Sequence, residues 1–173
     1  MTTMTDRRSL EPRFGKARFV SAPVHLIVSA TASSIIGLRT QQIWQRLSDP
    51  RSFGAFLSHL DHVRQIALDE YDWRLRGCVE IAPIRFFVRE PPTHLAWQSM
   101  HHRDKRTALQ IVGELRLEAL GWQTRLRLRL NYVCQDATLS DTLRTTLHDL
   151  PAQLEADLIA MHDRLKAPLC DPS

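Results

Sequence analysis

The sequence predicts a single α+β domain in which an antiparallel sheet packs against one long C-terminal helix. Residues 107–134 alternate apolar and polar side chains, as two strands joined by a turn do, and residues 138–166 repeat apolar side chains at helical spacing. The chain has 173 residues, of which 43% are hydrophobic, enough for one domain with a real core.

The N-terminal part of the domain is expected to form a strand followed by two short helices. Residues 24–32 alternate, with Leu26, Val28 and Ala30 on one face. The first helix takes Thr40 as its N-cap and ends at Asp49-Pro50, because the residue before a proline disfavours the helical conformation. A second short helix covers residues 50–60, where aromatic and leucine side chains recur at helical spacing.

A series of strands is expected next. Residues 63–68, 71–76 and 95–99 alternate in the manner of strands. Residues 79–89 give another strand, broken or bulged near Pro83, since proline does not donate to a central ladder.

The hairpin within residues 107–134 has a predictable register. A two-residue loop of Gly121 and Trp122 suits a type II′ turn, because glycine comes first. Arg116 opposite Arg127 is then the one unfavourable cross-strand pair. The other predicted pairs are Leu117–Leu126, Leu115–Leu128, Gly113–Leu130, Ile111–Tyr132, Glu118–Arg125 and Glu114–Arg129.

The C-terminal helix carries a continuous apolar stripe. Pro151 lies inside it and either kinks the helix or marks its true start. A stripe of this kind serves a core or a coiled-coil seam, and the one-sided sheet makes packing on that sheet the simpler interpretation. Its members are Leu139, Leu143, Leu147, Leu150, Leu154, Leu158, Met161 and Leu165.

Charge is concentrated at the N-terminus. The chain has a net charge of +4, and residues 1–22 hold five basic and two acidic side chains, so the rest is close to neutral. A nucleic-acid partner is therefore not expected, since the body lacks a basic face. We expect a flexible basic tail over residues 1–22, a ligand-binding domain over residues 23–168 and a short tail over residues 169–173.

The remaining composition points to a reduced compartment, and we expect a cytoplasmic protein. The three cysteines form no C-x-x-C pair, which argues against a disulfide scaffold or a zinc site. No apolar run reaches the ~18 residues of a membrane span, which leaves only transient membrane contact open. His59 and His62 give at most a partial metal site, and no nucleotide or cofactor motif occurs, so neither metal nor cofactor is expected.

Several segments resemble the START-like, or SRPBCC, superfamily of polyketide cyclase/dehydrase and lipid-transport proteins. They read "IWQRLSDPRSFGAFL", "THLAWQS", "GWQTRLRLRLNY" and "QLEADLIAMHDRLK", and the similarity spans residues 24–166. The resemblance implies the helix-grip fold, a curved antiparallel sheet wrapped around the long C-terminal helix, with two short helices after the first strand. It also implies an internal cavity for a lipid, quinone, polyketide or hormone.

Inward-facing side chains are the expected ligand contacts, although aromatic side chains on such faces are more often plain core. Tyr132 and Ser99 are the best inward polar candidates, and Gly113 marks either a bend in the sheet or a place where a ligand or a backbone approaches closely. Filling that space with Gly113→Leu is expected to weaken probe binding and leave the fold intact. The full set is Trp44, Phe56, Trp73, Phe86, Trp97, Ser99, Ile111, Gly113, Leu128, Tyr132, Leu154, Leu158 and Met161.

The leading hypothesis is a non-catalytic carrier or sensor of a small hydrophobic ligand, because no inward-facing Asp, Glu or His stands out as an acid or base. The alternative is a polyketide-type cyclase or dehydrase, for which Tyr132 is the one candidate proton donor. A third hypothesis is a protein-interaction domain whose long helix packs on a partner. The sequence leaves the catalytic residues, the ligand and the oligomeric state open.

Overall fold

The computed structural model describes residues 23–100 and 108–166, so the expectations for residues 1–22 and 169–173 lie outside it. The α+β prediction is confirmed. The strands are β1 (Leu26–Ile36), β2 (Leu60–Ala67), β3 (Glu70–Leu75), β4 (Ile81–Glu90), β5 (His94–Ser99), β6 (Leu109–Leu120) and β7 (Gln123–Cys134). The helices are α1 (Thr40–Leu47), the 3₁₀ turn η1 (Pro50–Ser52), α2 (Phe53–Phe56), α3 (Ala137–Thr146) and α4 (Leu150–Lys166).

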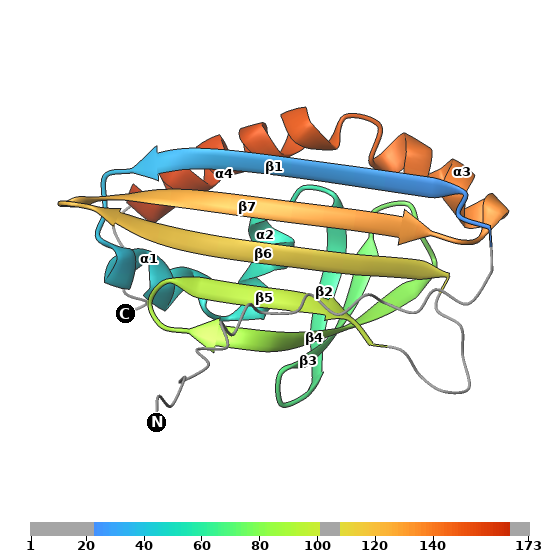
Figure 1. The fold of residues 1–173 in the computed structure, drawn as a ribbon, viewed down its shortest axis with the longest axis horizontal. Helices are drawn as coiled ribbons and strands as arrows, with labels where there is room; N and C mark the ends of the chain where they lie inside the picture. Colours follow the sequence, from blue (N-terminus) through green and yellow to red (C-terminus); the bar gives the residue numbers. More distant parts are fainter. Residues whose placement is uncertain (1–22, 101–107, 167–173) are drawn as a thin grey trace, which may run out of the picture.

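The strands form one antiparallel sheet in the order β1-β7-β6-β5-β4-β3-β2. The first strand thus lies beside the last, and β2 forms the opposite edge. Helix α4 packs against β1 and contacts α2, so the helices gather on one side of the sheet, which we call its inner face (Figure 1). The other, outer face carries the alternate side chains of each strand.

The predicted hairpin register is confirmed throughout β6 and β7. Leu115 faces Leu128, Ile111 faces Tyr132, and Arg116 faces Arg127. Gly121 has a φ of +66°, whereas Trp122 keeps an ordinary negative φ, as a type II′ turn requires.

Two strands differ from the sequence-based expectation. Strand β1 runs on to Ile36 because it pairs with β7 along its whole length. Strand β4 includes Pro83, which pairs with Asp72 of β3, and its irregularity falls between Phe86 and Val88 instead. The carbonyl of Pro83 still accepts a hydrogen bond from Met100, so the proline removes one donor without breaking the strand.

The C-terminal stripe is divided between two helices. Helix α3 ends at Thr146, and α4 begins at Leu150 with Pro151 as its second residue. Proline suits this position because a first-turn N–H has no intrahelical acceptor, whereas in a continuous helix its ring would clash with the carbonyl of Leu147. Of the two readings of Pro151, the true start of a helix is the correct one.

The interior is built by the two predicted apolar surfaces. Leu143, Leu154 and Leu158 are at most 1% exposed, and they belong to the same core as the inward residues of β6 and β7. The packing of the stripe on the sheet is therefore confirmed. In the described segments, no helix combines the length and the apolar character that crossing a membrane requires.

Candidate functional site

A pair of polar side chains lies buried in the interior of the molecule. His59 Nε2 and the Tyr132 hydroxyl are 2.5 Å apart, although the two residues are 73 positions apart in the sequence. The exposed fractions are 2% for His59 and 1% for Tyr132. His59 Nδ1 has no hydrogen-bond partner among the described residues. Because an unmet polar atom in an apolar interior costs free energy, a polar group brought next to His59 Nδ1 would relieve that cost.

The chain around His59 explains why a histidine points inward. Helix α2 ends at Phe56, and the backbone of Leu57 already has an extended conformation. His59 therefore does not continue a helical face. The His59 carbonyl accepts a hydrogen bond from the Arg76 N–H, which aligns this segment with the end of β3. Its side chain therefore projects to the inner face, toward β7.

Asp157 of α4 holds the neighbouring residue in place. One carboxylate oxygen of Asp157 accepts hydrogen bonds from the backbone N–H of Ser58 at 2.9 Å and from its hydroxyl at 3.2 Å. Burial raises the pKa of Asp157, while the bonds from Ser58 and the charge of Arg164 oppose that shift. Arg164 also donates a hydrogen bond to the Ala55 carbonyl. Helix α4 thus fixes the segment that carries His59.

Both members of the buried pair are neutral at neutral pH. Burial lowers the pKa of His59 to about 4, and burial also raises the pKa of Tyr132 above its usual range. In a neutral pair one proton lies between the two side chains, and another N–H or O–H is left to donate elsewhere. The pair can therefore donate a hydrogen bond to an acceptor such as a carbonyl oxygen.

Beside this pair the interior is filled by aromatic rings. Phe53, Trp73, Phe86 and Trp97 contact one another, with ring centroids between 5.2 and 6.5 Å apart. The indole N–H groups of Trp73 and Trp97 are buried and lack a hydrogen-bond partner among the described residues. Three of the predicted ligand contacts thus pack mainly on one another.

The expectation that Gly113→Leu leaves the fold intact is wrong. Gly113 lies beside Trp97 in the β5–β6 ladder. A Cβ atom at Gly113 would come closer than 3.0 Å to three atoms of the Trp97 indole. The group that approaches this glycine closely is therefore neither a ligand nor a backbone, as was expected, but an indole side chain of the same chain. A leucine has no room there without displacing Trp97.

Ser99 is buried as expected, but its hydroxyl is engaged. The Ile111 N–H donates a hydrogen bond to Ser99 Oγ at 2.6 Å. This bond continues the contact between β5 and β6 beyond the last ladder pair, Gln98 with Val112. Ser99 therefore closes the ladder, and Tyr132 is the predicted polar residue that reaches toward another side chain in the interior.

The other predicted contacts are buried in one continuous core, at 8% exposure or less, and their contact with a ligand stays a prediction. The two aromatic ones lie on the helices that follow β1, three lie on α4, and two lie on the hairpin. They are Trp44, Phe56, Leu154, Leu158, Met161, Ile111 and Leu128.

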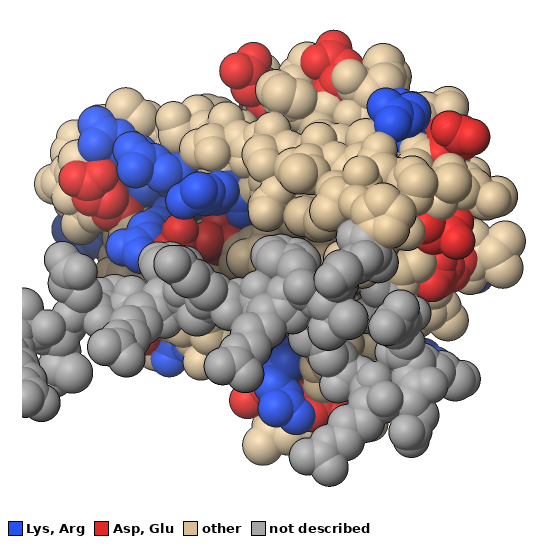
Figure 2. Space-filling model, turned by 45° about the vertical axis from the view of Figure 1, so that its right-hand side comes forward, with Lys and Arg blue, Asp and Glu red and all other residues tan. Residues whose placement is uncertain are grey.

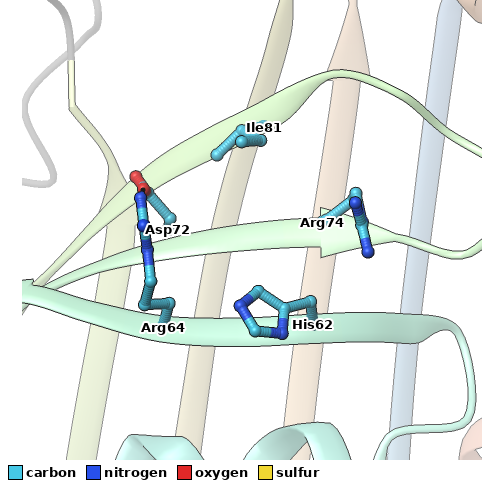
Figure 3. Close-up of a pocket in the computed structure, with 5 residues that line it drawn as sticks. All are labelled: His62, Arg64, Asp72, Arg74 and Ile81. Atoms are coloured by element: carbon cyan, nitrogen blue, oxygen red, sulfur yellow. Dashed lines mark hydrogen bonds and ion pairs between the residues drawn. The ribbon is translucent and has the colours of Figure 1, made fainter.

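The expectation that no acid or base faces inward is wrong, because His59 does. The spacing of His59 from His62 had suggested only a partial metal site, yet the two side chains point to opposite faces of the sheet. His59 is buried, whereas His62 lies on the outer face in a hollow of about 200 Å³ with Arg64, Asp72 and Arg74 (Figure 3). Arg64 and Asp72 form an ion pair of 2.8 Å there. Most residues that line this hollow are charged or polar, and it lies on the other face of the sheet from the buried pair.

A curved seven-stranded antiparallel sheet, two short helices after the first strand and a long C-terminal helix on the inner face define the START-like, helix-grip fold. Solved structures confirm it. DR_A0006 from Deinococcus radiodurans has a TM-score of 0.62 at 17% identity, covering 79% of this chain and 96% of that one. No family model matches the sequence, and no curated protein does.

Two further solved structures carry descriptive names. The Zhui aromatase/cyclase from Streptomyces sp. R1128 has a TM-score of 0.57 at 12% identity, covering 80% of this chain and 95% of its own. A START superfamily protein from Mycobacterium smegmatis has a TM-score of 0.51 at 12% identity, covering 78% of this chain and 98% of its own. At these identities the likeness shows a common fold.

Proposed function

We propose that the protein binds a small, largely apolar molecule between the sheet and α4, and that the His59–Tyr132 pair anchors a polar group of that molecule. The observation that carries the proposal is the buried histidine whose Nδ1 atom has no partner among the described residues. A pocket of this kind is mainly apolar and uses a few polar groups to fix orientation. The START-like fold of the chain agrees with such a role.

The neutral pair favours a ligand with a hydrogen-bond acceptor. A free carboxylate would lose its hydration in this interior, and the buried ionisable side chains of the described core include no Lys or Arg to balance its charge. A carbonyl oxygen is uncharged, so burying it costs less, and it accepts a hydrogen bond from the N–H or O–H that the pair leaves free. Quinone-like and polyketide-like molecules meet both conditions.

The test is native mass spectrometry of the purified protein, followed by titration of a fluorescent apolar probe. We expect a retained molecule or a saturable probe site, and Tyr132→Phe should weaken binding of a carbonyl-bearing probe by roughly tenfold, the value of a buried hydrogen bond. Ser99→Ala is the matched control, since that hydroxyl bonds to the backbone of Ile111. Absence of any bound molecule and of any saturable probe site would count against the proposal.

A second candidate function is cyclisation or dehydration of a polyketide-type substrate. Its specific support is that His59 and Tyr132 together form a proton donor and acceptor in an apolar interior. A comparison of the wild type with His59→Gln distinguishes the two candidate functions. For an enzyme, His59→Gln should abolish turnover of a poly-β-ketone substrate and leave its dissociation constant nearly unchanged. For a carrier, no turnover occurs with the wild type, and the same variant alters only binding.

A further inference from the structure

The outer face of the hairpin carries a pair of arginines that repel one another. Arg116 of β6 lies directly opposite Arg127 of β7. Like charges directly opposite one another destabilise a sheet. Opposite charges, such as Glu118 opposite Arg125 in the same hairpin, are the more usual arrangement. The repulsion between Arg116 and Arg127 would be relieved by an anion placed between them.

The hydrogen bonds around this pair leave donors free. Arg116 uses its Nε to contact Glu114 Oε1 at 2.6 Å, and neither of its terminal nitrogens has a partner among the described residues. Arg127 forms no ion pair or side-chain hydrogen bond within that same part of the chain. Arg125, by contrast, binds Glu118 at 2.8 Å. The two terminal nitrogens of Arg116 and the whole guanidinium group of Arg127 are therefore available to donate hydrogen bonds.

These donors line a hollow on the outer face of the sheet. The hollow measures about 510 Å³, and its rim includes Thr93, His94 and the arginines at 116, 125 and 127, with Glu90 and Glu118 as its acidic members. Figure 2 shows basic side chains gathered at one side of the molecule with acidic ones among them. The arginines outnumber the carboxylates in the lining, which favours an anion.

We propose that this hollow binds a phosphoryl group between Arg116 and Arg127. A phosphoryl group has three acceptor oxygens and a charge of about −1.5 to −2, so it can accept hydrogen bonds from two guanidinium groups at once. A carboxylate is satisfied by a single arginine fork. The site lies on the opposite face of the sheet from the His59–Tyr132 pair, so it is independent of the proposed function.

Isothermal titration with inorganic phosphate tests the site, at constant ionic strength with chloride as the reference anion. Arg127→Gln should weaken phosphate binding by at least about tenfold, as loss of a charge-assisted hydrogen bond would. Arg129→Gln is the matched control: it removes the same charge from the same strand, but Arg129 does not line the hollow. The control should weaken binding much less than Arg127→Gln does, because Arg129 does not line the hollow and acts on the anion only through its partly screened charge.

Arg127→Glu supplies a second and sharper signature. It places a carboxylate opposite Arg116, so we expect a higher melting temperature than the wild type without phosphate and no further rise when phosphate is added. Wild-type protein should instead be stabilised by phosphate. Equal stabilisation of the wild type and both Arg127 variants would overturn the proposal, as would a wild type that does not respond to phosphate or to the vesicles described next.

The source of the phosphoryl group is decided by co-sedimentation with phosphatidylcholine vesicles, with and without phosphatidylglycerol. Binding of free phosphate that depends on Arg127, without vesicle binding, indicates a soluble phosphate ester. Binding to the phosphatidylglycerol vesicles that depends on Arg127, without binding of free phosphate, indicates a lipid headgroup. Vesicle binding that is the same in Arg127→Gln and Arg129→Gln would reflect general charge attraction and would contradict a specific site.

Discussion

Gly113 shows how a single missing side chain organises the interior. The indole of Trp97 occupies the place where a Cβ atom at Gly113 would stand. Trp97 is then held against Phe53 and Phe86, at ring distances of 5.2 and 5.3 Å. The glycine is thus required by a close approach, although its backbone is ordinary.

Gly113→Ala should therefore destabilise the protein. Pushing the Trp97 ring out of its place is expected to cost about 1–3 kcal/mol of unfolding free energy, the usual range for overpacking. Denaturant unfolding followed by tryptophan fluorescence measures this cost. Gly54→Ala is the control, because its added Cβ would meet Val63 at an ordinary 3.5 Å. If both variants unfold at the wild-type midpoint, the close contact with Trp97 is not a constraint.

His59 makes stability depend on pH in a predictable direction. Its pKa is about 4 in the folded protein, against about 6.5 in an unfolded chain. Between these values the unfolded state binds the proton first, so stability falls as the pH drops from 6.5 toward 4, by up to about 3 kcal/mol. Above pH 6.5 this contribution is constant.

Urea unfolding at a series of pH values checks this prediction. His59→Gln should flatten the decline between pH 6.5 and 4, whereas His62→Gln, which changes an exposed histidine on the next strand, should preserve it. Asp157 contributes equally to both variants, so the difference isolates His59. The same slope in the two variants would mean that the buried histidine is not neutral in the folded state.

The inward orientation of His59 was not predictable from the local sequence. Aromatic and leucine residues recur at helical spacing up to Leu60, so the pattern predicted a short helix over residues 50–60 that includes His59. The chain leaves the helix at Phe56, and Asp157, 99 residues away from Ser58, binds the backbone beyond that point. The approach of Trp97 to Gly113 was hidden for a similar reason, since β5 and β6 are not joined by a short turn that fixes their register.

At the level of elements, the β6–β7 hairpin was predictable almost pair by pair, because a two-residue turn and strict alternation determine the register. The C-terminal helices were predictable in part. The apolar stripe identified the buried face, and Pro151 offered either a kink or a start. Deciding between these readings requires the conformation of the chain between the two helices, where Leu147 leaves the helical region with a φ of −110° and a ψ of 15°.

The docking of α4 leads to a prediction about two adjacent residues. Leu158 is 1% exposed against the sheet, whereas Ile159 is 63% exposed. Leu158→Ala should cost about 2–5 kcal/mol of unfolding free energy, because it removes buried methyl groups and leaves a cavity. Ile159→Ala should stay within about 0.5 kcal/mol of the wild type. Chemical denaturation of both variants is the measurement, and comparable losses would mean that α4 is docked by another face.

At the scale of the whole molecule, the domain proposed for residues 23–168 should fold without the basic segment that precedes it. Deleting residues 1–20 removes most of the excess positive charge and no predicted apolar face, so the melting temperature should stay within a few degrees. A deletion of residues 1–30 is the comparison, because it also removes the first half of β1, which pairs with β7. It should abolish cooperative unfolding, and a marked drop for the shorter deletion would show that residues 1–20 help to hold the fold.

The pairing of β1 with β7 has a consequence for how the protein is made. Ser29 and Asn131 are hydrogen-bonded neighbours in the sheet but lie 102 positions apart. A ribosome adds ~5–20 residues each second, so β1 emerges on the order of 5–20 s before its only strand partner in the described sheet. Throughout this interval a segment without any Lys, Arg, Asp or Glu, from Val24 to Leu38, waits unpaired. Translation thus imposes a delay during which nascent chains are exposed to mispairing, and a chaperone that holds such segments should raise the yield of native protein.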